Sequence, residues 1–200
     1  MTCIVVPTNP TDAILDARVV YLIQQQIATL SWLDACYGIA EVAEMKKDDG
    51  SIEVFPRVYA NLANVPQTYK DVRYDDSLKA QAFFERDSEY TLGEDGEEDQ
   101  ISYSLSIVVW ANLYKVDPLR SYDFTDQLAG DILRILKDNF DAHIDEYRID
   151  LRSASAYSKY TMSDVENRFI TLPYTAFRIS FRYTEFKSPV CYTFTPTASS

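Results

Sequence analysis

The sequence predicts an α+β domain in which a mostly antiparallel sheet carries two main helices, at about 12–33 and 123–140, packed on one face. Two segments, 101–113 and 175–186, alternate between apolar and polar residues, which is the period of a strand with one buried face. The segment 123–140 has apolar residues at the spacing of an amphipathic helix. Because 200 residues are enough for one core, we expect a single domain spanning 1–200.

The first part of the chain predicts an arm, a helix and a hairpin. Residues 1–9 predict an extended N-terminal arm, and an apolar stripe from Leu15 to Leu33 predicts the first helix. Asp48-Asp49-Gly50 lies between two extended segments and is typical of a hairpin turn. Pro56 lacks a backbone donor, so we expect the second arm of this hairpin to be an edge strand or to be bulged there.

The middle of the chain predicts a second hairpin. Residues 61–78 are polar and predict a long loop. The segment 81–90 follows as a strand, with Phe83 and Phe84 pointing to opposite faces. The acidic segment Glu94 to Asp99 then turns the chain into the next strand.

Two features of this hairpin suggest contacts with a partner. The even positions of the 101–113 strand begin with serine but become apolar at Val108 and Trp110, so this end must be covered on both faces, by the core or by a partner. Packed core cannot hold the carboxylates of the acidic turn without partners, so they must lie in solvent, in a channel lumen or against a basic partner. The candidate interface residues are therefore Val108, Trp110, Glu94, Asp95, Glu97, Glu98 and Asp99.

The last third of the chain predicts a capped helix, two strands and a second arm. Ser121 or Asp123 caps the 123–140 helix, and Tyr147 to Ser153 alternates like a strand. Residues 154–167 predict a loop, and 188–200 predict a C-terminal arm that orders only against something else. In the closing strand, one face carries Phe177, Ile179, Phe181 and Tyr183, and the other carries Arg178, Ser180, Arg182 and Thr184.

Charge and cysteine usage restrict the function classes. A net charge of −12 argues against a protein that grips nucleic acid by its phosphates or binds an anionic membrane, and fits a surface that DNA passes without sticking. Cys3, Cys36 and Cys191 are scattered and odd in number, as in a reducing compartment. The start has no basic signal-peptide region, and no apolar run approaches the roughly 20 residues of a membrane span. We expect synthesis in a cytoplasm.

The sequence offers no assembled set of catalytic, metal-binding or cofactor-binding residues. His143 is the single histidine and follows the second helix, where an exposed side chain favoured by the helix dipole explains it better than a catalytic pair does. The acidic segments lack calcium-loop spacing, and no glycine-rich phosphate loop is present. We therefore expect no enzyme activity, no metal and no cofactor. Carboxylate pairs such as Asp75/Asp76 and Glu97/Glu98 leave a hydrolase with a non-standard site as a distant third possibility.

Four segments give the chain a distinctive order of polarity patterns: Phe83 to Arg86, Ser104 to Leu113, the helix 123–140 and Leu172 to Phe181. Over roughly 10–186, this order resembles that of the tail terminator and tail-completion (neck) proteins of long-tailed bacteriophages. The resemblance rests on patterns of polarity rather than on chemical signatures.

The resemblance implies a structural virion protein whose copies form a ring, usually of six, in the phage neck or tail. Such a ring terminates or joins the tail tube, contacts other tail or neck proteins, and lets DNA pass without specific binding. It implies no catalytic residues and no membrane, and a virion location after synthesis in the host bacterial cytoplasm. The alternative is an acidic interaction protein of the inhibitor or DNA-mimic type, acting as a monomer or dimer. The oligomeric state separates the two.

Overall fold

The computed structural model describes residues 3–5, 15–60, 68–95, 98–161 and 171–187. The strands are β1 (Ile4–Val5), β2 (Ala35–Lys46), β3 (Ile52–Ala60), β4 (Thr68–Asp71), β5 (Ala80–Asp95), β6 (Glu98–Asn112), β7 (Ile144–Asp150) and β8 (Tyr174–Lys187). The helices are α1 (Leu15–Ile27), α2 (Leu113–Val116), α3 (Thr125–Phe140) and α4 (Ser153–Ala156), with a 3₁₀ turn at Asp141–His143.

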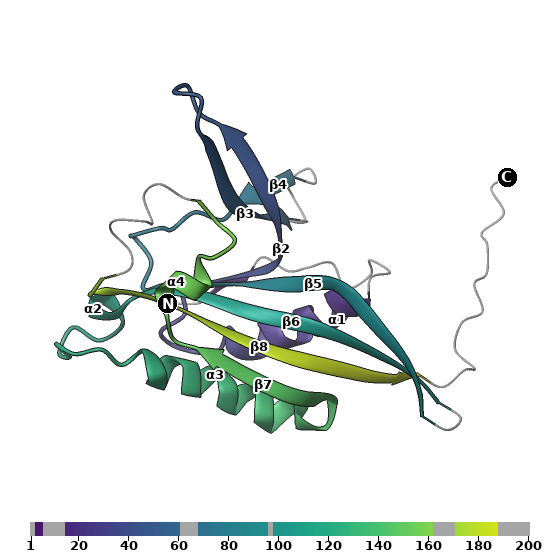
Figure 1. Ribbon diagram of the computed structural model, residues 1–200. Coiled ribbons are helices and arrows are strands. Elements are labelled where there is room, and N and C mark those ends of the chain that lie inside the picture. The colour runs from purple at the N-terminus through teal and green to yellow at the C-terminus, as the bar shows by residue number, and fades with distance from the viewer. Residues whose placement is uncertain (1–2, 6–14, 61–67, 96–97, 162–170, 188–200) are drawn as a thin grey trace, which may run out of the picture.

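The strands form a sheet in the order β4-β3-β2-β5-β6-β8-β7, and β1 is an additional partner of β2. Neighbouring strands are antiparallel except for β1 with β2 and β2 with β5, which are parallel. The long helices α1 and α3 lie on the same face of the sheet (Figure 1). The expected α+β class, with a mostly antiparallel sheet and two main helices on one face, is confirmed.

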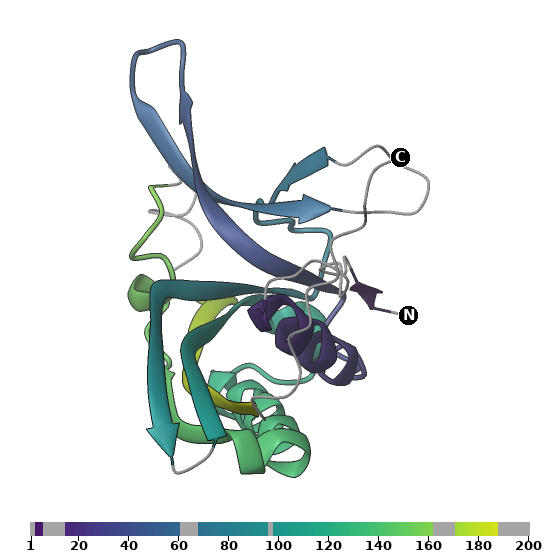
Figure 2. The ribbon, with the colours of Figure 1, turned by 90° about the vertical axis from the view of Figure 1, so that its right-hand side faces the viewer.

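Strand β2 changes partners halfway along its length. Its first part pairs with β5 as far as Ile39, with a register shift after Cys36, and residues 40–46 pair with β3. The β2–β3 hairpin consequently projects from the main sheet (Figures 1 and 2). The predicted turn at Asp48-Asp49-Gly50 is confirmed, and Gly50 has a φ of 84°, a conformation that glycine adopts without steric cost.

Pro56 lies where β3 has a partner on one side. It is opposite Val42 of β2, whereas β4 begins to pair with β3 at Arg57. Its missing donor therefore leaves no gap in the β3–β4 ladder, and its carbonyl accepts a hydrogen bond from the Val72 amide at 2.8 Å.

Apolar side chains form two cores, one on each face of the sheet. The first lies under the long helices and includes Val20, Ile23, Ile27, Phe84, Ile107, Leu128, Ile132, Leu136, Phe177 and Ile179. The second lies on the opposite face and includes Phe55, Val58, Phe83, Val108, Trp110, Tyr157 and Tyr160. Phe83 and Phe84 point into different cores, as the alternation predicted.

Some predicted boundaries differ from the structure. α1 ends at Ile27 rather than near 33, because the chain continues in tight turns in which the Thr29 hydroxyl donates to the Gln26 carbonyl at 2.6 Å. Its expected start at 12 lies outside the described residues. The expected loop 61–78 contains β4, and the expected loop 154–167 begins within α4.

The turns follow the sequence more closely than the helix cap does. The N-cap position of α3 is Phe124, without a side-chain capping bond, rather than Ser121 or Asp123. Asp123 precedes it, and its Oδ1 accepts from the backbone N and the hydroxyl of Thr125. The β5–β6 hairpin turns at the expected acidic segment, with Glu94 opposite Asp99 and Asp95 opposite Glu98. Of the expected terminal arms, Ile4–Val5 pairs with β2, while 6–9 and 188–200 lie outside the described residues.

Candidate functional site

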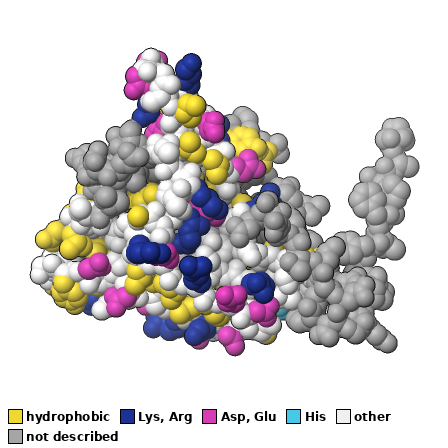
Figure 3. All heavy atoms as spheres, viewed as in Figure 1, with side chains coloured by type: hydrophobic (Ala, Val, Ile, Leu, Met, Phe, Trp, Pro, Cys, Tyr) yellow, Lys and Arg dark blue, Asp and Glu magenta, His cyan; other side chains and the backbone are white. Residues whose placement is uncertain are grey.

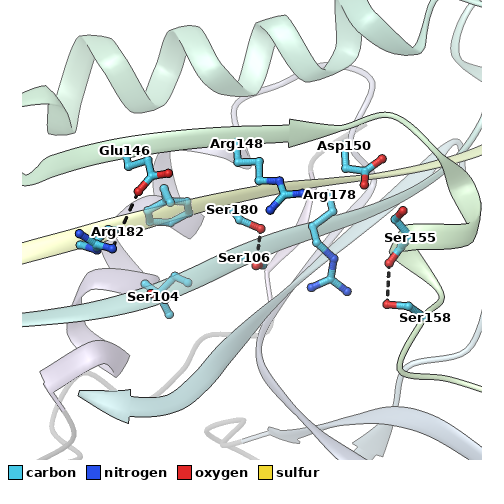
Figure 4. Close-up of a pocket in the computed structure, with 12 residues that line it drawn as sticks. Ser104, Ser106, Glu146, Arg148, Asp150, Ser155, Ser158, Arg178, Ser180 and Arg182 are labelled. Carbon is cyan, nitrogen blue, oxygen red and sulfur yellow. Dashed lines mark hydrogen bonds and ion pairs between the residues drawn. The ribbon is translucent and has the colours of Figure 1, made fainter. Parts of the chain in front are cut away.

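An open polar groove of about 390 Å³ lies over β6, β8 and β7, on the face of the sheet opposite the long helices (Figure 4). Its walls come from three strands and from the segment that follows α4. Lys and Arg side chains gather on this face of the molecule (Figure 3). The groove combines a defined shape with a lining of Ser, Arg, Glu and Asp side chains, so we take it as the candidate site.

Strand register places the groove residues in three rows that cross the sheet. On β6, β8 and β7 in turn, the first two rows are Ser104–Arg182–Glu146 and Ser106–Ser180–Arg148, and the third pairs Arg178 of β8 with Asp150 of β7. In the middle row, the Ser106 and Ser180 hydroxyls are hydrogen-bonded at 2.9 Å. The rows arise because alternate residues of a strand point to the same face. The side chains on one face of each strand pack in the core, and those on the other face line the groove.

A buried carboxylate, Glu85 of β5, fixes one end of the groove. Its side chain accepts two hydrogen bonds from Arg178, at 2.7 and 3.2 Å, and one from the Tyr160 hydroxyl at 2.7 Å. The Lys159 ammonium lies 2.8 Å from the same carboxylate. These bonds tie the segment after α4 to β5 and β8.

Burial and hydrogen bonding act in opposite directions on Glu85. Burial alone would raise the pKa of the carboxyl, but the hydrogen bonds from Arg178, Lys159 and Tyr160 outweigh it and hold the pKa below its usual value. Burial, together with the neighbouring Glu85 charge, raises the pKa of Tyr160, which keeps its hydroxyl protonated as a donor. The cluster is therefore a charged carboxylate held by two cations and one phenol.

The other groove arginines are less firmly held. Arg182 is 3.9 Å from Glu146, and both side chains are more than half exposed. Arg152 pairs with Asp150 at 2.8 and 3.0 Å, and these hydrogen bonds hold the pKa of Asp150 well below its usual range. Arg148 has no ion pair within the described part of the chain, and Figure 4 shows it extending from β7 toward β8.

The groove is consequently basic, in a chain that is acidic as a whole. Its cations and those beside it are Arg148, Arg152, Arg178, Arg182 and Lys159, and its carboxylates are Glu85, Glu146 and Asp150. Five cations against three carboxylates leave an excess of two positive charges. The arrangement can attract and orient an anion.

A second surface feature is the set of exposed apolar side chains. On the projecting β2–β3 hairpin these are Val42, Met45 and Ile52. At the end of the molecule near α2 they are Tyr114, Leu119, Tyr122 and Leu172, where Figure 3 shows hydrophobic side chains on the surface. Val42 and Met45 are three residues apart on β2 and therefore point to opposite faces of the hairpin, so each face carries its own exposed apolar side chain.

Val108 and Trp110 are completely buried within the chain itself, which corrects the expectation that they contact a neighbouring copy. The Trp110 ring lies 5.1 Å from the Phe83 ring and 5.4 Å from the Tyr157 ring. The double-sided burial predicted for this end of the strand is therefore met by the protein's own second core, one wall of which is the segment 153–160.

The predicted acidic residues lie apart from the groove. Glu94, Asp95, Glu98 and Asp99 are at the paired end of the β5–β6 hairpin, and Glu97 lies outside the described residues. The sequence places Arg178 and Arg182 on the polar face of the closing strand but does not indicate a groove there, because Glu85 and β7 come to lie beside that face only through strand pairing.

The residues considered for chemistry are not assembled into a site. His143 is half-buried, stacked on Tyr183 at 5.3 Å with Nδ1 3.3 Å from the Thr184 carbonyl oxygen. Asp75 accepts hydrogen bonds from the side chain and backbone N of Ser77, which lower its pKa, whereas a general acid needs a raised one. No group of three potential metal ligands occurs among the residues described.

Two cysteines, Cys3 and Cys36, lie among the described residues. Cys36 is buried and Cys3 is partly buried, and burial raises the pKa of Cys3 to about 11 and that of Cys36 well above its usual value. Cys191 lies outside the described residues. Both described thiols behave as small apolar groups, which fits the reading from the sequence.

Comparisons with known proteins identify no relative. The sequence matches neither a protein-family model nor a curated protein. In the described part of the chain, the helices are too short or too polar to cross a membrane.

Proposed function

We propose that this protein is a structural component of a bacteriophage neck or tail, whose copies form a ring that terminates or joins the tail tube and lets DNA pass. The observation that carries the proposal is a surface suited to protein contacts: an open polar groove together with a projecting hairpin that exposes Val42, Met45 and Ile52. The confirmed α+β class, with two helices on one face, agrees with the resemblance described above.

The projecting hairpin offers a template for a second chain. Residues 41–46 of β2 pair with β3, and the pairing of β2 with β5 stops at Ile39. One edge of this stretch therefore has no partner strand among the residues described. An open edge with exposed Val42 and Met45 favours strand addition by another copy. Repeated contacts between unlike surfaces close into a ring when the rotation allows.

The charge of the chain suits a ring around DNA. Duplex DNA binds proteins mainly through phosphate contacts with Lys and Arg, and this chain carries a net charge of −12. Passing DNA would be repelled weakly rather than held, over a distance of about 8 Å at physiological salt.

Oligomeric state tests the proposal. We expect light scattering coupled to size-exclusion chromatography to give the mass of a closed ring at high protein concentration, and negative-stain images to show a central hole. The variant Val42→Lys/Met45→Lys should shift the protein toward the monomer. Leu22→Lys, at an exposed apolar position of α1, is the matched control and should not.

A protein that stays monomeric at every concentration, also when mixed with purified tail tubes, would contradict the ring. That outcome would favour the acidic inhibitor or DNA-mimic alternative, which acts as a monomer or dimer.

A further inference from the structure

We propose that the groove over β6, β8 and β7 binds the acidic tip of the β5–β6 hairpin, residues 94–99, of a second copy of this chain. The inference deepens the proposed function, since it adds a second contact between neighbouring copies to the strand addition at β2, and it rests on that self-association.

The groove has two guanidinium groups available for a new anion. Arg148 has no ion pair within the described chain, and it lies beside the hydrogen-bonded pair Ser106 and Ser180. Within the described residues, Arg182 has one ion pair, a 3.9 Å contact with Glu146. Exposed pairs of this kind contribute little, so a better acceptor can replace Glu146.

Arg178 contributes positive charge to the groove but no free donor for a new ligand. Its side chain is largely buried, and both of its terminal nitrogens are already bonded to Glu85. With Lys159 on the same carboxylate, this cluster keeps an excess positive charge at the end of the groove. Guanidinium forks at Arg148 and Arg182 then match the geometry of carboxylates, which they bind with two parallel hydrogen bonds.

The chain itself carries a segment with the required chemistry. Residues 94–99 include five carboxylates in six residues. The backbones of Glu94 and Asp95 are paired with those of Asp99 and Glu98, so these four residues are already ordered as strand before binding. A preorganised segment loses less conformational entropy when it docks.

The tip cannot reach the groove of its own chain. Asp99 and Ser104 are five residues apart on β6, about 17 Å at the rise of an antiparallel strand. β6 is paired with β8 from Asp99, opposite Lys187, through Ser104, opposite Arg182, so the hairpin cannot fold back. A tip that occupies the groove therefore comes from another copy, and the contact joins two different surfaces in a head-to-tail manner.

A carboxylate-rich segment fits this groove better than a nucleic acid does. The net charge of −12 opposes the approach of a long polyanion, whereas a short acidic tip meets mainly the local excess of positive charge. A groove of about 390 Å³ also holds a few side chains rather than a duplex.

Charge reversal tests the contact in the full-length protein. We expect Arg148→Glu/Arg182→Glu to weaken self-association at least tenfold, measured by analytical ultracentrifugation at low and high salt. Lysine at the five acidic positions of the tip should have the same effect. A chain that carries both sets of changes should associate again, because each altered groove then meets an altered tip.

Controls separate binding from folding. Arg134→Glu, on α3 at the opposite face, should leave association unchanged. Circular dichroism and thermal unfolding show whether each variant is folded. If Arg148→Glu/Arg182→Glu does not fold, Arg148→Gln/Arg182→Gln removes the charges without reversing them and should still weaken association.

A labelled peptide of residues 90–103 tests the groove independently of ring formation. Fluorescence anisotropy should show binding that falls with salt and is lost in Arg148→Glu/Arg182→Glu. Peptide binding by a monomeric wild-type protein would support the groove while overturning the ring. A wild-type ring with unaffected groove variants and no peptide binding would overturn the inference and leave the proposed function standing. Binding of a DNA duplex, but not of the peptide, that is lost in the groove variants would also overturn it.

Discussion

Replacing Glu85 with glutamine should lower the free energy of unfolding by about 3 kcal/mol at neutral pH. Glu85 is 3% exposed, and the Arg178 side chain that it holds is 13% exposed. Glutamine keeps the shape and one acceptor oxygen but leaves the Arg178 charge uncompensated. Breaking a buried pair in this way costs about 3–5 kcal/mol, and we take the lower end because Lys159, which is 41% exposed, can turn toward water.

The loss should depend on pH in a defined direction. The pKa of Glu85 is lower in the folded protein than its usual value of 4.5, so the charged carboxylate stabilises the fold above that value. This stabilisation disappears as the pH falls through the folded pKa. The difference between wild type and Glu85→Gln should therefore be full at neutral pH and should shrink below pH 4.5.

Urea unfolding followed by tryptophan fluorescence measures the effect, because Trp110 lies beside the Tyr157 ring in the second core. Protein concentration is kept constant, since self-association would add to apparent stability. Glu146→Gln is the matched control: its carboxylate is 68% exposed and should change the free energy by less than about 1 kcal/mol. If Glu85→Gln unfolds within about 0.5 kcal/mol of wild type at neutral pH, the buried cluster does not hold the segment after α4 as argued.

Three further outcomes follow from single residues. Gly50→Ala should destabilise the protein by about 1 kcal/mol in urea unfolding, because the φ of 84° disfavours a residue with a Cβ. A Cβ added at Gly50 or at Gly130 meets no atom within 4 Å, so steric overlap plays no part at either position. Gly130→Ala, in α3, should instead stabilise the protein by about 0.5–1 kcal/mol. Tyr157→Phe should be neutral or slightly stabilising in the same assay, since the buried hydroxyl has no hydrogen-bond partner among the described residues; a loss above about 1 kcal/mol would contradict this. In native protein at pH 8, iodoacetamide should modify Cys3 slowly and Cys36 hardly at all, as located by peptide mass spectrometry, and modification of Cys36 as fast as after unfolding would refute the burial argument.

The periodic segments of the fold could be predicted from the sequence, because each depends on local alternation. The opposite directions of Phe83 and Phe84 and the Asp48-Asp49-Gly50 turn both follow from neighbouring residues. The parallel pairing of β2 with β5 could not be predicted, because its partners are Ala35 and Gln81 and no local pattern specifies them.

The candidate site could not be predicted from local sequence patterns for the same reason. The Arg178 and Arg182 face was visible in the sequence, but its meaning depends on β7 and on Glu85, which strand register brings beside it. The burial of Trp110 on both faces of the sheet was predictable, whereas the residues that pack over its ring were not. One of these residues is Tyr157, which lies in a segment that looks polar and that the sequence predicts as a loop.

The position of β8 has a consequence for synthesis on the ribosome. β8 lies between β6 and β7, so both of these strands expose an edge until residues 174–187 have left the exit tunnel. About 60 residues separate the end of β6 at Asn112 from the start of β8 at Tyr174, which at typical elongation rates takes roughly 3–12 s. During that interval the nascent chain carries an unfinished sheet that can pair with other strands. A stop codon within β8 should therefore yield insoluble product rather than a slightly shortened native protein.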